Sequence, residues 1–556
     1  TIAMSRRAIL LPALLWFAGP TSPAATRAGE SLPNVVFFFA DDIGWADPGR
    51  YHEFYADGVN QPIPAPVPTP NMNRLCDEGM MFTDAQLPAA LCAPNRFCVL
   101  TGSNTYRSRP WGTWNRTSSS AFHFGNAEDD RIGNPHRTIG DVLQTAGYRT
   151  AFFGKMHLGG DFYDSTGALL RDLPNEDINQ IDFSRKFDNG MIDHGFDYTF
   201  VTPDGIQGPL YAYFENDTYR PVSDFAAEID GVNVSGSSVL KSFTAGETVG
   251  TGEILVDGYG DSEFDTSEHG PVLTHFACKF IDDHLANHSG QPFMLYYASP
   301  AIHVPHTPSS DGIEADGATG LGKRPDFVYD LDAQLGILLA KLDSLGIAGN
   351  TIVVVTSDNG GFEDINGDGA GQAAAGQDPN GPLRASKGSI YEGGHRVPFI
   401  ARWPGRIQAG SECDELVTLL DMTATLASLT GGTIPTGAAI DSCDVLPALL
   451  GRPHDKPGRD TFVAHVGGVA GRVPLAIRKG PWKLITEGGA RPSFKDADRS
   501  NRTPLSAEDR KPFLVNLADD PGESKNVAAE DPERVLEMKT LLQKIVDQGR
   551  GPTDDP

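Results

Sequence analysis

The amino-acid sequence predicts an α/β fold with a large, mostly parallel β-sheet flanked by helices. Short apolar runs alternate along the chain with longer segments of helical pattern, which is typical of a parallel sheet. Four of these runs are apolar nearly throughout, as expected for strands that are buried on both faces. They are NVVFFFA (34–40), RTAFFG (149–154), PFMLYYAS (292–299) and TIVVVTS (351–357).

Helices are expected directly before the second and the fourth of these strands. The segment TIGDVLQTAG ends at Gly147, and the segment 326–346 ends at Gly346. Glycine is the preferred residue just past the end of a helix because it adopts a left-handed backbone without strain. Each segment therefore predicts a helix that leads into a strand of the sheet.

The end of the chain has a different pattern. GPWKLIT (480–486) and PFLVNLADDPGESKNVA (512–528) predict short antiparallel strands with a turn. The last segment predicts a helix that Asp531 caps, with Pro532 in its first turn and an apolar core-facing stripe. We therefore expect a smaller C-terminal α+β subdomain at 456–556, after a catalytic domain at 33–455.

The beginning of the chain has the features of an export signal. Arg6 and Arg7 precede the apolar run AILLPALLWFAG, which is too short to span a bilayer, and small residues follow it. We expect residues 1–28 to be a cleaved signal peptide of the secretory or the twin-arginine type. The mature protein is then expected in the periplasm or outside the cell, with no membrane span.

Composition narrows the possible partners. A hydrophobic content of 39% and a charged content of 21% are typical of a globular protein. The formal net charge of −28 argues against a nucleic-acid partner, which requires a basic surface. An anionic substrate must therefore be held by a local cluster of positive side chains or by a metal ion.

Six cysteines in 556 residues are too few for a disulfide scaffold. They are Cys76, Cys92, Cys98, Cys278, Cys413 and Cys443. Their spacing does not match a zinc site, and a bridge between Cys413 and Cys443 is possible.

Chemically capable side chains follow each of the four predicted strands. In an open α/β sheet, ligands bind outside the carboxyl ends of the strands, so we expect these side chains to share one site. They are Asp41 and Asp42, Lys155 and His157, His303 and His306, and Asp358 and Asn359.

The oxygen-bearing members of this set predict a metal site. Asp41, Asp42, Asp358 and Asn359 offer only oxygen ligands, which suit a hard divalent cation rather than zinc. Calcium is the first choice and magnesium the second. The nearby segment EDINGDGAGQ (363–372) matches the first half of an EF-hand loop. Ala375 stands where a bidentate glutamate is needed, so we interpret this segment as an acidic loop at the rim of the site.

The stretch LCAPNRFCVLTG (91–102) contains two cysteines six positions apart. Its pattern predicts a helix that begins at or just after Pro94. A helix N-terminus and the charge of Arg96 would both lower the pKa of a nearby thiol, which makes Cys92 a candidate reactive centre. A buried, unreactive Cys92 is the alternative, and Cys98 is expected to pack in the core.

At this point the chain resembles the type I sulfatase family of the alkaline-phosphatase-like superfamily. The similarity runs in order over nearly the whole chain after the export signal. Two departures stand within it: Met156 replaces a tryptophan, and Asn95 stands where the family usually has serine. The segments that carry the resemblance are CAPNRFCVLTG, GKMHLGG, TPNMNRL, TSDNGG, LRASKGSIYEGGHRVPFI and LVNLADDPGESKNVA.

The resemblance implies a sulfuric ester hydrolase with a specific set of roles. A formylglycine-generating enzyme would oxidise Cys92 to formylglycine, whose hydrated form attacks sulfur. Lys155, Lys387 and the metal would neutralise the sulfate oxygens, and Arg96 would hold the formylglycine. His303 would protonate the leaving alcohol, His157 would take a proton from the second hydroxyl of the nucleophile, and His306 is a possible substrate contact.

The substrate is the least determined part of this hypothesis. A sulfated carbohydrate is expected from the habit of the family, with a sulfated small molecule as the broader class. Tyr211, Tyr213 and Phe214 could stack on sugar rings, although core packing is the commoner role of such aromatics. A phosphonate monoester hydrolase or phosphodiesterase with the same nucleophile, and a non-catalytic carbohydrate-binding protein, are the alternative functions.

Overall fold

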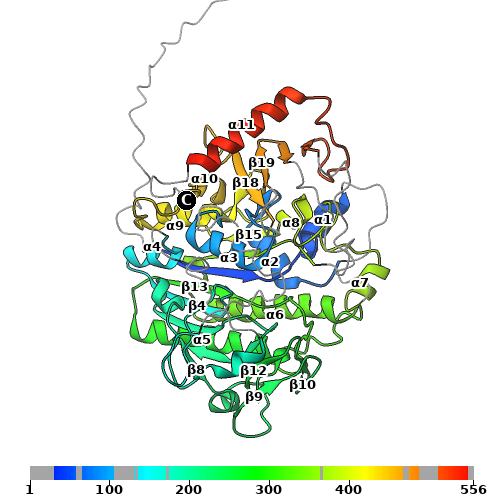
Figure 1. The fold of residues 1–556 in the computed structure, drawn as a ribbon. Helices are drawn as coiled ribbons and strands as arrows, with labels where there is room; N and C mark the ends of the chain where they lie inside the picture. The colour runs from blue at the N-terminus through cyan, green and yellow to red at the C-terminus, as the bar shows by residue number, and fades with distance from the viewer. Residues whose placement is uncertain are drawn as a thin grey trace, which may run out of the picture.

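A ten-stranded mixed β-sheet crosses the centre of the molecule, with helices on both faces (Figure 1). The computed structural model describes residues 31–57, 66–105, 132, 136–170, 175–362, 367–466, 475–486 and 511–548. The expected signal peptide lies outside the described residues. In spatial order the strands are β16 (Ser411–Cys413), β2 (Met80–Phe82), β15 (Phe399–Arg402), β14 (Thr351–Ser357), β1 (Asn34–Ala40), β13 (Phe293–Ala298), β4 (Arg149–Lys155), β5 (Tyr198–Thr202), β7 (Tyr213–Glu215) and β8 (Thr218–Arg220).

The five central strands are parallel, and antiparallel strands flank them. The order β14-β1-β13-β4-β5 is parallel throughout, so the carboxyl ends of all five strands lie at one edge. On one side β15 pairs antiparallel with both β14 and β2; on the other, β7 pairs antiparallel with both β5 and β8. All four strands expected from the sequence are therefore confirmed, and they are spatial neighbours.

Strand β1 shows how the core divides. Val35, Phe37 and Phe39 belong to the core on one face of the sheet, whereas Val36 and Phe38 belong to the core on the other. The first face is covered by α3 (Cys92–Thr101), α4 (Ile139–Thr145) and α9 (Met422–Thr430); the second is covered by α2 (Pro70–Glu78), α5 (His269–Asn287) and α6 (Lys323–Ser344). Burial on both faces explains why the strand is apolar throughout.

The remaining described elements are short. The shorter helices are α1 (Gly49–Asp57), α7 (Ala370–Ala374), α8 (Glu392–His395) and α10 (Leu446–Leu449). The shorter strands outside the main sheet are β3 (Ala85–Gln86), β6 (Leu210–Tyr211), β9 (Leu240–Phe243), β10 (Thr248–Val249), β11 (Gly252–Glu253), β12 (Gly258–Asp261) and β17 (Val417–Thr418).

The helix ends partly follow the sequence expectations. Helices α4 and α6 stop two residues before Gly147 and Gly346, and both glycines adopt a positive φ, at 84° and 68°. Helix α3 starts at Cys92, two residues earlier than expected, so Cys92 lies in the first turn rather than before it. In the part of the chain that the structure describes, no helix combines the length and apolar character needed to cross a membrane.

The C-terminal region forms a separate four-stranded antiparallel sheet, as expected. Its strands are β18 (Thr461–His465), β19 (Leu475–Lys479), β20 (Trp482–Ile485) and β21 (Phe513–Asn516), and α11 (Pro532–Gln548) covers one face (Figure 1). The Asp531 carboxylate accepts a hydrogen bond from the backbone N–H of Arg534 at 3.0 Å, which confirms it as the cap of α11. The boundary at residue 456 stays a prediction.

The suggested bridge between Cys413 and Cys443 is wrong. Both thiols are free, as are the other four, and all six cysteines lie among the described residues. The backbone of each residue is held by a different partner: the Cys413 carbonyl accepts from Thr83, whereas the Cys443 N–H donates to Asp421. The two cysteines are therefore held by different segments of the chain.

Candidate active site

The carboxyl edge of the parallel strands carries a buried cluster of polar side chains. Asp41 and Asp42 follow β1, and Asp358 and Asn359 follow β14, its neighbour in the sheet. All four are at least 97% buried. Asp42 adopts a positive φ of 66°, in the left-handed region that is uncommon for residues other than glycine. Oxygen-bearing side chains from two strands therefore meet at one place, as the strand-end rule predicts.

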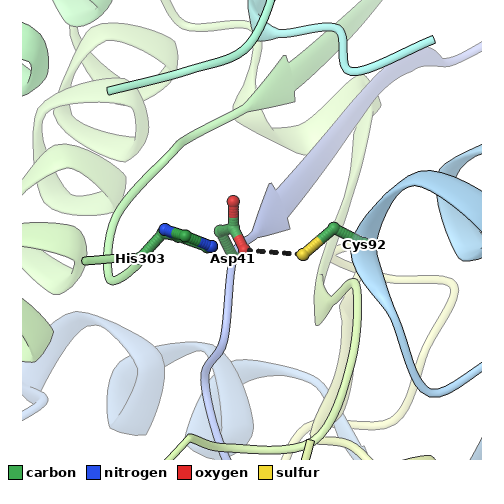
Figure 2. Close-up of side chains that lie close together, drawn as sticks. All are labelled: Asp41, Cys92 and His303. Atoms are coloured by element: carbon green, nitrogen blue, oxygen red, sulfur yellow. Dashed lines mark hydrogen bonds between the residues drawn. The ribbon is translucent and has the colours of Figure 1, made fainter. Parts of the chain in front are cut away.

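Cys92 lies inside this cluster of oxygens. Its Sγ lies 3.2 Å from Asn359 Oδ1 and 3.6 Å from Asp41 Oδ1. One ligand atom each from Asp41, Asp42, Cys92 and Asp358 can be chosen so that all lie within 4.8 Å of one another. Figure 2 shows Asp41 between Cys92 and His303, with the Cys92–Asp41 contact dashed.

Cationic side chains among the described residues balance the three carboxylates. Lys155 donates to Asp41 Oδ2, and Lys387 Nζ lies 2.5 Å from Asp42 Oδ1. Arg96 donates to Asp358 Oδ2 through Nε at 3.0 Å and Nη2 at 2.7 Å. Burying a charge costs several kcal/mol unless it is paired, so each cation offsets the burial of a carboxylate.

The surroundings shift the pKa values of Asp41 and Asp358 in opposite directions. Burial by itself would raise the pKa of Asp41, but Lys155, His303 and Arg96 hold that pKa well below its usual range. Burial and the neighbouring Asp41 charge raise the pKa of Asp358 to about 6. A cation bound between them would favour the ionised form of both.

The thiol of Cys92 is not activated, which corrects one expectation from the sequence. Burial, followed by the charge of Asp358, raises its pKa far above the ordinary value, although Lys155 and Lys387 oppose this. The effect expected of a helix N-terminus is overridden because the sulfur is buried and lies near the charges of Asp358 and Asp41. As a thiol, Cys92 is therefore a poor nucleophile at neutral pH.

His303 and His306 occupy different surroundings. The Nδ1–H of His303 donates to the Val304 carbonyl at 2.7 Å, and one imidazole nitrogen points toward Asp41 (Figure 2). Burial and the charges of Lys387 and Lys155 lower its pKa to about 3, so the ring is neutral. His306 Nδ1 instead lies 3.1 Å from Asp368 Oδ2, in the acidic loop that follows β14.

His157 lies beside the same cations. It follows β4 with a positive φ of 54°, and its backbone N–H donates to the Pro203 carbonyl at 2.7 Å. Burial, then the charges of Lys155 and Arg96, lower its pKa well below the usual range. The ring is therefore neutral and can accept a proton from a neighbouring group.

Two further contacts were not foreseen from the sequence. Asn95, the departure from the usual family signature, is fully buried, and its Nδ2 donates to the Asp358 carbonyl at 2.8 Å. Gln207, after β5, accepts from Lys155 Nζ at 2.9 Å. The fifth strand, YTFVT, is polar enough to be overlooked, but the residues after it meet the same strand-end rule.

The aromatic residues considered for sugar stacking are core residues. Tyr211 and Tyr213 are at most 1% exposed, as is Phe214. Phe214 packs edge-on against Phe187 at 5.3 Å, and Tyr213 packs against Phe200 at 5.3 Å. The core-packing alternative is therefore confirmed for all three.

A parallel sheet with this buried, oxygen-rich edge places the chain among enzymes of the alkaline-phosphatase-like fold. The family model described as Sulfatase matches residues 33–432, so the chain belongs to the sulfatase family. It is a sulfuric ester hydrolase, as the sequence resemblance implied.

Individual relatives extend this assignment over nearly the whole chain. An N-acetylgalactosamine-6-O-sulfatase of Bacteroides thetaiotaomicron is 31% identical, over 98% of this chain and 99% of its own length. Arylsulfatase A of Bos taurus is 32% identical, over 91% of this chain and 85% of its own length. A solved structure from glycosaminoglycan metabolism by B. thetaiotaomicron superposes with a TM-score of 0.71 and 29% identity, covering 93% of this chain and 100% of that one.

Proposed function

We propose that this enzyme removes sulfate from a sulfated carbohydrate, with formylglycine derived from Cys92 as nucleophile and calcium as its metal. The observation that carries the proposal is the position of Cys92. Its side chain lies in the middle of the oxygen cluster, 3.2 Å from Asn359 Oδ1, yet its thiol is not activated. A residue placed at the reacting centre in an unreactive form is what a precursor of another nucleophile requires.

The donor set supports a hard divalent cation. Asp41, Asp42, Asp358 and Asn359 supply three carboxylates and an amide oxygen, with ligand atoms of the three carboxylates within 4.8 Å of one another. Calcium accepts six to eight such oxygens in flexible geometry, whereas magnesium demands a stricter octahedron. When bound, the cation would supply Lewis-acid chemistry that acidifies a hydroxyl group and neutralises sulfate oxygens.

The side chains of this enzyme would perform the remaining steps. Lys155 and Lys387 each present an ammonium group at the cluster, paired with Asp41 and Asp42 respectively. Each would be able to bind a sulfate oxygen if a bound cation neutralised these carboxylates instead. Arg96 is proposed to hold the formylglycine, and it also fixes Asp358 through two hydrogen bonds. Its third hydrogen bond, from Nη1 to the Lys155 carbonyl at 2.9 Å, fixes the end of β4.

The two histidines would move protons. His303 is neutral and keeps Nδ1–H on the Val304 carbonyl, so its Nε2 carries no proton at rest. To protonate the leaving alcohol, Nε2 would first have to take up a proton and then pass it on. His157 is neutral and lies near Lys155 and Arg96, where it can take a proton from the hydrated formylglycine. His306 lies near the rim loop and is assigned to contact with the organic part of the substrate.

A carbohydrate substrate is supported by the relatives rather than by a described pocket. Two of them, from B. thetaiotaomicron and Sus scrofa, are named as sulfatases of N-acetylgalactosamine 6-sulfate. An exported location, with cleavage after residue 28, is part of the same proposal. N-terminal sequencing of the secreted protein tests it.

Cys92→Ala tests the nucleophile, with Cys98→Ala as its matched control in the same helix. The substitution at Cys92 is expected to abolish turnover of sulfated N-acetylgalactosamine and of aryl sulfates. Cys98 is buried in the core behind the site, so its variant should keep activity. Mass spectrometry of the peptide that contains Cys92 should show conversion of thiol to aldehyde in the wild type. Undiminished turnover by Cys92→Ala would overturn the proposal, and faster turnover of phosphonate esters would favour the phosphonate hydrolase alternative.

A further inference from the structure

The C-terminal sheet presents two buried cations to the catalytic domain. Arg478 on β19 and Lys483 on β20 are directly paired across the strands, so their side chains lie on the same face. Both are at least 93% buried. Like charges opposite each other in a sheet are destabilising, and burial makes them more so. Such an arrangement persists only where acidic partners meet it.

The acidic partners come from both parts of the chain. Glu392, the first residue of α8, lies with its Oε1 2.9 Å from Lys483 Nζ. Glu523, in the turn after β21, lies 2.9 Å from the same Nζ. Asp84 accepts two hydrogen bonds from Arg478, at 2.7 Å and 2.5 Å. The two cations are thereby compensated. Two of the three ionic contacts, Lys483–Glu392 and Arg478–Asp84, tie the C-terminal sheet to the main domain.

Glu392 has a second link to the same sheet. Its backbone N–H, at the start of α8, donates to Glu523 Oε2 at 2.6 Å. Its carboxylate also accepts from Gln86 at 2.8 Å and from Arg396 at 2.9 Å. A carboxylate at the first N–H of a helix satisfies a donor that the helix leaves unpaired. The C-terminal subdomain therefore fixes both ends of this residue, the side chain and the main chain.

Helix α8 in turn lies against the backbone of the active site. The N–H of Gly360, the residue after Asn359, donates to the Gly394 carbonyl at 3.1 Å. A Cβ added to Gly360 would lie 1.8 Å from the Gly393 carbonyl oxygen, so these two segments touch with no room for a side chain. A shift of α8 must therefore move the loop that carries Asn359.

The same helix contacts the loop that carries Lys387. The N–H of Gly393 donates to the Arg384 carbonyl at 2.8 Å, and a Cβ on Gly393 would lie 2.1 Å from the Ala385 carbonyl oxygen. The Lys387 N–H donates to the Gly361 carbonyl at 3.2 Å, which joins this loop to the loop of Asn359. The loops that carry Asn359 and Lys387 therefore both contact α8.

We infer that Lys483 and Glu523 are positioning residues for the sulfatase reaction, acting through Glu392 and α8 to set the places of Asn359 and Lys387. This inference rests on the roles assigned to Asn359 and Lys387 in the proposed function. The C-terminal sheet is then part of the support of the active site. Its contribution passes through backbone contacts, because the glycines at 360, 393 and 394 leave no side chain to absorb a displacement.

Lys483→Met and Glu523→Ala test the inference, with Leu484→Ala as a matched control on the same strand. Leu484 lies on the opposite face of β20, in the core beneath α11, so its truncation loosens the subdomain without touching Glu392. Glu523→Gln is the conservative variant, because its amide oxygen can still accept from the Glu392 N–H. Each protein is first checked by mass spectrometry for conversion of Cys92 and by thermal unfolding for the folded state.

The expected result is a loss of kcat of roughly 10- to 100-fold in Lys483→Met and Glu523→Ala, with KM changed less than about threefold. Their affinity for calcium chloride, measured by thermal shift, should also fall, and Glu523→Gln should recover most of the activity. Wild-type kcat and calcium affinity in folded Lys483→Met would overturn the inference, as would an equal loss in Leu484→Ala. If the wild type itself turns over no sulfate ester, the proposed function fails, whereas the calcium comparison still tests the positioning.

Discussion

Replacement of Arg96 by leucine should destabilise the protein by about 3–5 kcal/mol, because it removes one partner of a buried ion pair. Arg96 is 1% exposed and donates three hydrogen bonds, two to Asp358 and one to the Lys155 carbonyl. At an effective dielectric constant of about 20, unit charges roughly 3 Å apart attract by about 5 kcal/mol. Relief of the desolvation of the guanidinium offsets part of this loss, but Asp358 stays buried with its cation gone.

The assay is thermal unfolding of the metal-free protein, with Arg50→Leu as the matched control. Arg50 also contacts two carboxylates, Glu53 at 2.8 Å and Asp77 at 2.5 Å, but its side chain is 44% exposed. An exposed pair contributes about 0–1 kcal/mol. With an unfolding entropy of about 2.1 cal/mol/K per residue over 556 residues, 4 kcal/mol corresponds to a Tm decrease of about 3 °C. Equal decreases in the two variants would refute the reasoning from burial.

Two further predictions concern pH and metal. Burial and the charges of Asp265, Asp311 and Glu263 raise the pKa of Glu268 to about 8, so its protonated form stabilises the folded state at low pH and this stability is lost as pH rises toward 8. Relative to Glu268→Gln, the wild type should therefore lose at most about 4 kcal/mol between pH 5 and 8; parallel pH profiles of Tm would contradict this. Calcium added to chelator-treated protein at 100 times its Kd should stabilise the wild type by about 2.7 kcal/mol, a Tm rise of about 2 °C, and Asp358→Asn should lose that rise. An unchanged wild-type Tm would exclude a calcium site in the oxygen cluster.

The central sheet and most of the candidate site followed from local patterns. A strand buried on both faces must be apolar throughout, so the four runs were visible without any tertiary information. Parallel pairing then brings the residues after them to one edge, which explains why Asp41, Lys155, His303 and Asp358 are neighbours. The prediction that these residues share one site needed only the identity and direction of the strands, not the geometry of the side chains.

The acidity of Cys92 could not be predicted in the same way. A helix N-terminus and Arg96 are local features, and both favour a thiolate. The opposing contributions come from burial and from Asp358, which is 266 positions away in the sequence. The sign of the shift therefore depends on tertiary structure. The same holds for the role of Asn95, whose partner is the backbone of Asp358.

The buried lysine of the C-terminal sheet shows a different limit. In the strand WKLI, a lysine stands between apolar residues. Because successive side chains point to opposite faces of a sheet, this pattern predicts that the lysine faces solvent. Here both faces are covered, one by α11 and the other by the main domain, so Lys483 is 2% exposed. Its acidic partners, Glu392 and Glu523, lie 91 positions before it and 40 positions after it.

A hydrophobic residue at position 483 could hold the C-terminal sheet against the main domain without the desolvation free energy of a buried charge. Buried ion pairs are often no more stabilising than apolar contacts of the same volume. An apolar side chain, however, cannot fix the orientation of the residue that it contacts. The ionic contact specifies the place of Glu392, and the hydrogen bond to Glu523 specifies the start of α8. Because Gly360 and Gly393 touch without side chains between them, a displacement of α8 would be passed to the loop of Asn359. Lys483 therefore does two things: it compensates the buried charges of Glu392 and Glu523, and it fixes the position of Glu392.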